Sequence, residues 1–219
     1  MEIHKPKPWH DSREFLKEIG TIVIGVLIAL AAEQAVEWVH WHHQVGETRI
    51  ALRQEIAHDL GALDSLKLEN PCIQQRLDAL DAWAAKNNRP LVEPSRTPLL
   101  WTIRSSTWEV AKTGQNAAHF PLQEQLSYAQ MYDLLTNEWG FVQAERVAWE
   151  HIDALANSGE HDAAHMTRLR DAVAEARELA RIRLGNQAIV DPAAEALGIM
   201  PEKIPSPAGR NLKSLCKPI

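Results

Sequence analysis

The chain has 219 residues, of which 45% are hydrophobic and 24% charged, and its formal net charge is −6 at pH 7. This composition argues against global disorder, and an acidic chain without a Lys/Arg-rich patch in its middle argues against a nucleic-acid partner. Two cysteines are too few and too far apart for a zinc ribbon. Ten Gly, two Tyr and three Phe are few, which favours helices over sheet.

The first feature along the chain is an uncharged run at residues 19–32, which ends at Glu33. As a helix it would be about 21 Å long, short of the hydrocarbon core of about 30 Å. A cleaved signal peptide is therefore one alternative, since residues 29–31 supply an A-x-A site. A buried helix of a soluble domain is another.

We favour a transmembrane anchor with an interfacial collar over residues 19–41. Helical, weakly polar sequence continues without a break across residues 16–39, which would be about 36 Å long. Trp9 lies before the run and Trp38 and Trp41 lie after it, where aromatic residues gather at membrane interfaces.

Basic residues predict the orientation of this anchor. Four precede the run and only Arg49 follows it within a comparable distance; the four are Lys5, Lys7, Arg13 and Lys17. The positive-inside rule therefore places residues 1–18 in the cytoplasm and the bulk of the chain outside it.

One face of the anchor carries small residues at four-residue spacing, namely Thr21, Gly25 and Ala29, and Glu33 extends the same face. Small side chains at this spacing let two helices approach closely, so we predict a helix-packing interface here. The alternative for Glu33 is a carboxylate that reaches the interface from a helix end.

Two stretches resemble parts of known families: residues 15–41, FLKEIGTIVIGVLIALAAEQAVEWVHW, and residues 107–120, TWEVAKTGQNAAHF. They look like the N-terminal anchor, and the later Trp-Glu pair followed by Gly, of uncharacterised single-pass bacterial proteins described only as domains of unknown function. The likeness covers roughly residues 1–60 and this central patch. It implies a bacterial single-pass membrane protein and no activity. Together with the orientation above, it places the anchor in the inner membrane and the C-terminal domain in the periplasm.

Residues 42–190 predict an antiparallel helical bundle, so the expected fold class is all-α. A long helix to about Leu68 repeats apolar residues at helical spacing: Val45, Leu52, Ile56, Leu60 and Leu63. Asn70 and Pro71 are expected to cap and restart a second helix, whose apolar side carries Ile73, Leu77, Leu80 and Trp83. Residues 86–98, with three prolines, predict a loop.

Three further helices are expected. One opens at Thr97-Pro98, carries Trp101, Ile103 and Trp108, and stops near Gly114. The next runs from Pro121 to about Asn157, with a buried side made of Leu122, Leu126, Ala129, Tyr132, Leu135, Trp139, Val142 and Trp149. After a break at residues 158–159, the last long helix spaces Met166, Leu169, Val173, Ala176 and Ala180 by alternating three and four residues.

The C-terminal part, residues 191–219, predicts a short helix and an extended tail. VDPAAEALG has an Asp cap, a Pro and a terminal Gly, which is typical of a short separate helix. The tail carries Lys203, Arg210, Lys213 and Lys217 against Glu202 alone. It could lie on anionic lipid headgroups or an acidic partner, or it could be a merely solvated terminus.

Two histidine pairs have spacing that suits a metal ligand set. His40 and His43 lie one turn apart with Glu37 on the same face, and His161 and His165 are four residues apart. A polar collar above the membrane and a solvated first turn explain them as well, and the pair at residues 161–165 lacks the Glu of an H-E-x-x-H motif. We therefore assign no catalytic, cofactor-binding or metal-binding residue and expect no cofactor.

Cys72 and Cys216 form a candidate disulfide, since both thiols would face an oxidising compartment if the bundle is periplasmic. Nothing in the sequence shows that the two lie close together.

The sequence thus predicts a non-enzymatic interaction protein, an accessory or scaffolding subunit of a larger inner-membrane assembly. Its expected partners are the lipid bilayer and other membrane-protein subunits or further copies of itself. An extracytoplasmic sensor with a pocket lined by Trp101, Trp108 or Trp139 is the first alternative. A metal-dependent enzyme at His161 and His165 is the second.

Overall fold

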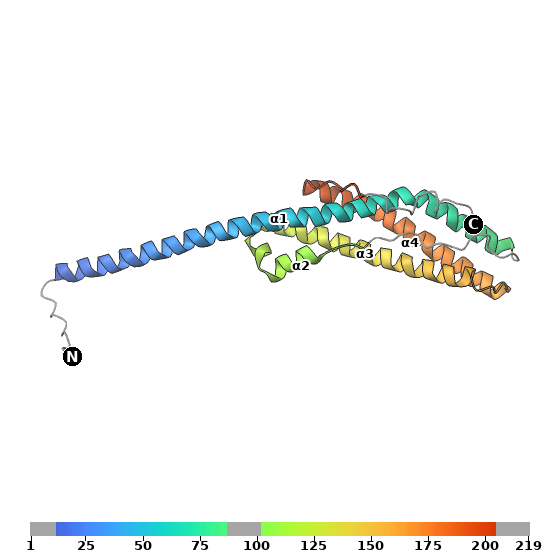
Figure 1. Ribbon diagram of the computed structural model, residues 1–219, viewed down its shortest axis with the longest axis horizontal. Coiled ribbons are helices and arrows are strands. Elements are labelled where there is room, and N and C mark those ends of the chain that lie inside the picture. Colours follow the sequence, from blue (N-terminus) through green and yellow to red (C-terminus); the bar gives the residue numbers. More distant parts are fainter. Residues whose placement is uncertain (1–11, 87–101, 205–219) are drawn as a thin grey trace, which may run out of the picture. The chain divides into compact units, whose positions relative to one another are not determined.

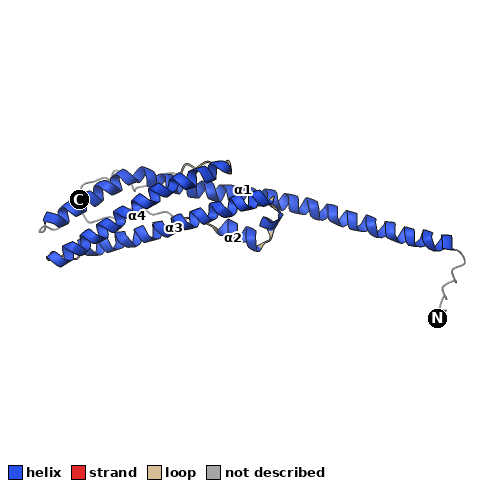
Figure 2. Cartoon of the chain, turned by 180° about the vertical axis from the view of Figure 1, so that it is seen from behind, coloured by secondary structure: helices blue, strands red, loops and turns tan. Residues whose placement is uncertain are grey.

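The computed structural model describes residues 12–86 and 102–204, and within them the chain is all-α, as predicted. The elements are α1 (Ser12–Lys86), α2 (Ser106–Thr113), the 3-10 helix η1 (Asn116–His119), α3 (Leu122–Ala156) and α4 (Ala163–Ala196). Figure 2 shows these elements coloured as helix, and no described residue is in a strand. Trp9, Trp101, Cys216, Arg210, Lys213, Lys217 and the predicted loop at residues 87–98 lie outside the described residues.

The chain divides into two compact units, Met1–Glu47 and Thr48–Ile219. The described part of the first unit is a single stretch of helix α1. The second unit contains the remainder of α1 together with α2, η1, α3 and α4. In it α3 and α4 run side by side with the second half of α1 (Figure 1).

The predicted break at Asn70 and Pro71 is wrong, because α1 continues through Pro71 to Lys86. A proline inside a helix costs about 3 kcal/mol and favours a kink, and α1 bends within its second half (Figure 1). Leu66 and Ile73 on either side of the proline are both fully buried. Their burial holds the helix together across the proline, since each contributes about 1.5–3 kcal/mol.

The core of the second unit is the seam where α1, α3 and α4 meet. One cluster takes Ile73, Leu77, Leu80 and Ala84 from α1, Ala148, Trp149, Ile152 and Ala156 from α3, and Met166, Leu169, Ala172, Val173 and Ala176 from α4. All five apolar positions predicted for α4 are buried, and so are the five predicted between Val45 and Leu63. Periodic burial of this kind is what an amphipathic helix in a bundle requires.

The predicted buried side of α3 is only partly correct. Tyr132, Leu135, Val142 and Trp149 are buried, but Leu122 is 70% and Leu126 is 53% exposed. Residue 126 lies two positions before the buried Tyr128, which is about 200° around the helix. The first turns of α3 therefore bury the opposite side, where Tyr128 meets Phe120 and Tyr132 meets Trp108.

Two helix ends also differ from the prediction. Helix α2 begins at Ser106 rather than near residue 97, and Ile103 is not helical, although the helix ends at Gly114 as expected. The short helix predicted around Asp191 and Pro192 is the last part of α4, which is continuous to Ala196. Gly198 then turns the chain with a φ of 63°, a conformation that glycine adopts without strain.

Candidate functional site

The apolar part of α1 is exposed along its whole length. An 18-residue window there has a mean hydropathy of 2.1 and none of it is buried. By length and composition this helix can cross a membrane, although signal sequences pass the same test. A core helix of a soluble domain would be mostly buried, so the exposure argues against that alternative.

The predicted packing face of this helix is open. A Cβ atom placed on Gly25 would meet nothing within 4 Å, and Ala29 and Glu33 are exposed. The hydroxyl of Thr21 donates to the carbonyl oxygen of Lys17 at 2.9 Å, so this side chain bonds to its own helix and stays compact. The face thus combines small side chains with accessibility, the two properties that close helix packing needs.

The residues predicted to form an interfacial collar contain stacked rings. Trp38 is 67% exposed and stacks on His42 with ring centroids 5.3 Å apart. Trp41 is half-buried and packs edge-on against His40. His43 lies 3.6 Å from Glu47. Among the described residues no group of three or more His, Cys, Asp or Glu side chains could hold a metal ion.

The two histidines around the start of α4 have different surroundings. The ring of His161 packs edge-on against Trp83 with centroids 5.8 Å apart. His165 is buried, and its Nε2 lies 2.8 Å from the carbonyl oxygen of Leu155 and 3.0 Å from Oγ of Ser158. Its Nδ1 lies 3.3 Å from Glu160, and its backbone N–H donates to the capping carboxylate of Asp162. Both ring nitrogens therefore have protein partners: Nε2 joins α4 to the end of α3, and Nδ1 faces Glu160 in the connection between the two helices. This geometry does not favour a metal ligand.

A carboxylate pair on α1 binds the start of α2. Glu55 accepts hydrogen bonds from the backbone N–H and hydroxyl of Thr107, the hydroxyl of Ser106 and the hydroxyl of Tyr132, at 2.8–3.1 Å. Asp59, one turn further along, accepts the backbone N–H of Arg104 with both oxygens at 3.1 Å. The N-cap residue of α2 makes no side-chain capping bond of its own, so α1 supplies the acceptors that this helix end needs.

The pKa values of these two carboxyl groups are shifted in opposite directions. Burial raises the pKa of Glu55, but hydrogen bonds from Thr107, Tyr132 and Ser106 outweigh it and bring the pKa below its usual value. Burial raises the pKa of Asp59 to about 7, and the negative charge of Glu55 adds to this effect against the Arg104 N–H. The pair therefore holds one firm negative charge and one proton-dependent charge.

A second polar layer lies inside the bundle. Arg183 of α4 donates from Nε to Glu145 of α3 at 2.9 Å, and both side chains are fully buried. The two terminal nitrogens of Arg183 have no hydrogen-bond partner among the described residues. Burial raises the pKa values of Glu138 and Glu69, and the charge of Arg183 counteracts this at both. Gln187 donates to the carbonyl oxygen of Leu63 and completes the layer.

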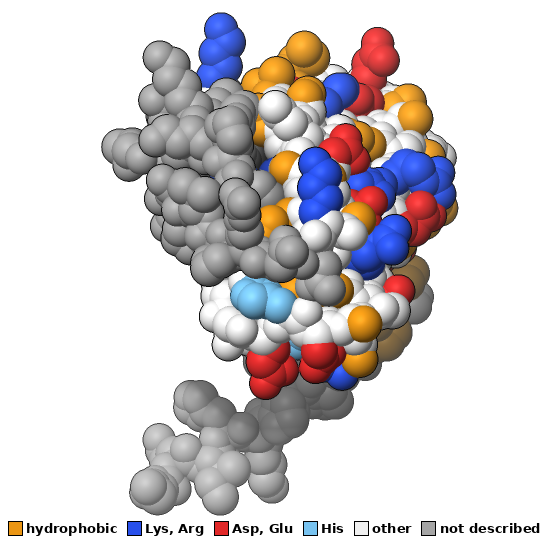
Figure 3. Space-filling model, turned by 90° about the vertical axis from the view of Figure 1, so that its right-hand side faces the viewer, with side chains coloured by type: hydrophobic (Ala, Val, Ile, Leu, Met, Phe, Trp, Pro, Cys, Tyr) orange, Lys and Arg blue, Asp and Glu red, His pale blue; other side chains and the backbone are white. Residues whose placement is uncertain are grey.

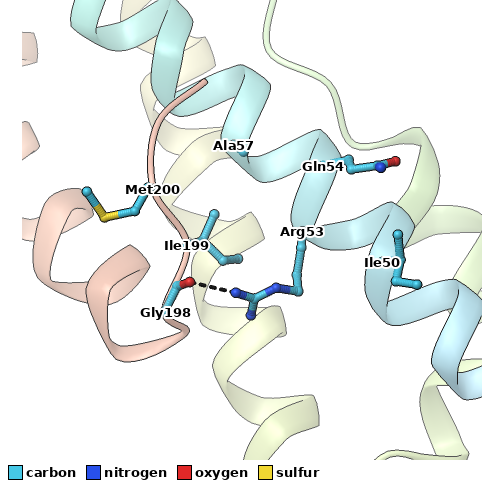
Figure 4. Close-up of a pocket in the computed structure, with 7 residues that line it drawn as sticks. All are labelled: Ile50, Arg53, Gln54, Ala57, Gly198, Ile199 and Met200. Atoms are coloured by element: carbon cyan, nitrogen blue, oxygen red, sulfur yellow. Dashed lines mark hydrogen bonds between the residues drawn. The ribbon is translucent and has the colours of Figure 1, made fainter. Parts of the chain in front are cut away.

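A surface groove of about 420 Å³ lies between α1 and the chain that follows α4. Its lining residues are Ile50, Arg53, Gln54, Ala57, Gly198, Ile199 and Met200. Figure 4 shows Arg53 pointing to the carbonyl oxygen of Gly198, and it also donates to that of Leu197, each at 2.6 Å. The guanidinium therefore caps the end of α4 instead of facing the groove as an open anion site.

Two of the tryptophans predicted for the sensor alternative, Trp108 and Trp139, do not line this groove. Trp108 is buried and stacks on Tyr132 with centroids 5.5 Å apart, and Trp139 is half-buried. On the face drawn in Figure 3, Lys and Arg side chains are interspersed with Asp and Glu. The described residues on that face form no single-sign patch of the kind that binds a polyanion.

Cys72 is disulfide-bonded, and the described residues contain no free cysteine. Because Cys216 lies outside the described residues, its pairing with Cys72 stays a prediction.

The chain matches no family model, and no curated protein and no solved structure is significantly similar to it.

The sequence did not lead us to predict the buried pair Glu55 and Asp59 or the polar layer around Arg183. For Arg183, the spacing of the apolar residues on α4 contained a signal. The stripe from Met166 to Ala180 continues at three- and four-residue steps through Arg183, Gln187, Val190 and Ala194, all of which are buried. Extending the same stripe beyond its last apolar member would have predicted that Arg183 faces the core.

Proposed function

We propose that the protein is a non-enzymatic, membrane-anchored interaction protein, an accessory or scaffolding subunit of a larger inner-membrane assembly. The observation that carries this proposal is the N-terminal stretch of α1, which is apolar, long enough to cross a bilayer and entirely exposed. An exposed surface of this kind requires lipid or protein around it. The basic residues before it support an orientation with the bundle in the periplasm.

The surface that meets the partner helix is the face of Thr21, Gly25, Ala29 and Glu33. It offers a shallow groove in which a second helix, from another subunit or another copy, can approach the backbone. Gly25 is its most demanding position, because any larger side chain fills the groove. The histidine pairs and the surface groove give no comparable support to an enzyme or a sensor.

The test compares Gly25→Leu with Val26→Leu in the full chain. Both keep the hydrophobicity needed for insertion, but residue 26 points about 100° away from residue 25. We expect Gly25→Leu to reduce co-purification or crosslinking from membranes while membrane localisation is kept, and Val26→Leu to behave as the parent. Glu33→Ala should weaken association if the carboxylate reaches a donor on the partner. Equal yields for both leucine variants and the parent would show that the helix is only a tether.

A further inference from the structure

Helix α2 contributes few buried apolar side chains to the bundle. Of its eight residues only Trp108 and Ala111 are buried, and Val110 is 65% exposed. The larger of the two buried side chains, Trp108, stacks on Tyr132 of α3. An element with so little buried apolar area is drawn from the low-stability end of a fold, so the carboxylates at its N-terminus carry much of its attachment.

Those carboxylates are only one helical turn apart and lie in the same buried environment. Glu55 is 8% exposed and Asp59 is 0% exposed. Five donors converge on the pair: the N–H and hydroxyl of Thr107, the hydroxyls of Ser106 and Tyr132, and the N–H of Arg104. Four of the five go to Glu55. Among the described residues, Asp59 has only the Arg104 N–H as a hydrogen-bond donor and the exposed Arg104 side chain as a favourable charge.

We propose that Glu55 and Asp59 form a proton-dependent latch on α2: the helix is held firmly while the pair carries one negative charge and is held weakly once Asp59 also ionises. The bistable element is the segment from Arg104 to Thr113, docked or released. In the docked state Glu55 is ionised because its donors include the Thr107 N–H at the start of α2, where a negative charge is favoured. In the released state a carboxylate with an ordinary pKa is ionised at neutral pH. The latch depends only on the second unit and is independent of the proposed membrane anchor.

Groups on each neighbouring element act on the ionisation of Asp59, and not all in the same direction. On α1 the Glu55 carboxylate opposes ionisation of Asp59, and before α2 the Arg104 side chain, which is exposed, favours it. On α3, burial and the hydrogen bond to Glu55 raise the pKa of Tyr132, so its hydroxyl keeps its proton and remains a donor. Burial is the largest effect on Asp59 and puts its pKa at about 7.

The sign of the effect follows from linkage. A carboxyl group whose pKa is higher in the docked state than in the released state binds more protons when docked. The contribution of Asp59 to docking is therefore fully present below its ordinary pKa of 3.8 and is lost as pH rises towards about 7. Below a pH of about 7 the docking equilibrium should fall about tenfold for each pH unit, and above it the equilibrium levels off. Between pH 6 and pH 8 the total fall should therefore be about tenfold.

Hydrogen–deuterium exchange of the full chain in detergent tests the latch. Protection of residues 106–113, corrected for the intrinsic pH dependence of exchange, should fall about tenfold from pH 6 to pH 8. In Asp59→Asn the side-chain oxygen can still accept from the Arg104 N–H but cannot ionise, so protection should no longer change with pH. Asp133→Asn, at an exposed carboxylate of α3, is the matched control and should follow the parent.

Glu55→Gln provides a second, independent variant. It lowers the charge-assisted hydrogen bonding to α2 at every pH, so residues 106–113 should lose protection at both pH 6 and pH 8 while α3 and α4 remain protected. Unchanged protection of the parent between the two pH values would overturn the latch, and so would an equal fall in the parent and in Asp59→Asn. If Asp59→Asn does not fold, the pH profile of the parent and the Glu55→Gln result decide the question.

Discussion

Removing one member of the buried Arg183–Glu145 pair should destabilise the bundle strongly. The pair is fully buried with its nitrogen and oxygen 2.9 Å apart. Arg183→Met leaves Glu145 as an uncompensated charge in the core and removes the cation that favours ionised Glu69 and Glu138. Breaking a buried pair in this way costs about 3–5 kcal/mol, a large part of a typical stability of about 5–15 kcal/mol.

Replacing both members tests whether the charge, and not the volume, causes this loss. In Glu145→Leu/Arg183→Met no charge of the pair remains, and such replacements are often neutral or stabilising. We expect the double variant to recover most of the stability lost by Arg183→Met. Urea unfolding of the full chain in detergent, followed by circular dichroism, measures the free energies of unfolding of all variants.

The exposed pair Arg181 and Glu178 on the same helix is the control. Arg181→Ala should leave the unfolding midpoint almost unchanged, because an ion pair in water contributes little. A loss of less than about 1 kcal/mol for Arg183→Met, or a double variant no more stable than the single one, would refute the assignment of a buried ion pair.

Two further predictions concern packing and the disulfide. An alanine Cβ at Gly61 would lie 2.2 Å from the carbonyl oxygen of Glu202 and 2.9 Å from Cγ1 of Ile204, so Gly61→Ala should displace residues 199–204 and cost about 1–3 kcal/mol in urea unfolding. Gly185→Ala, where nothing lies within 4 Å, should be neutral or stabilising; equal effects of the two would contradict the close approach. Thiol counting on folded protein prepared without reductant should find no free thiol if Cys72 pairs with Cys216, a bridge that chain entropy credits with about 4–5 kcal/mol. Two free thiols would end that prediction.

The sequence predicted the elements better than their ends. Helical periodicity identified the buried faces of α1 and α4, because apolar burial follows the 3.6-residue period. We predicted a helix break near Pro71 and another near Pro192, because local propensity favours a break at each proline, and both predictions are wrong. Apolar side chains such as Ile73 after Pro71 and Ala194 after Pro192 are buried and hold both helices through their prolines. Tertiary packing thus outweighed propensity at these two positions.

The buried polar residues could not be predicted from the sequence around each of them. Glu55, Asp59, Glu145 and Arg183 resemble the solvated residues of any helix when taken singly. Their partners lie far along the chain, as with Thr107 for Glu55 and Glu145 for Arg183. Only their positions on the apolar stripes indicated burial. Which donor each would meet depends on how the helices pack, which periodicity does not specify.

Fractionation of the native protein, combined with its intact mass, tests the central proposal most directly. We expect the chain to pellet with membranes, to resist carbonate extraction and to retain the apolar stretch within residues 19–41. A chain that is soluble and lacks residues 1–31 would contradict it, because the apolar stretch would then be a cleaved signal and not an anchor.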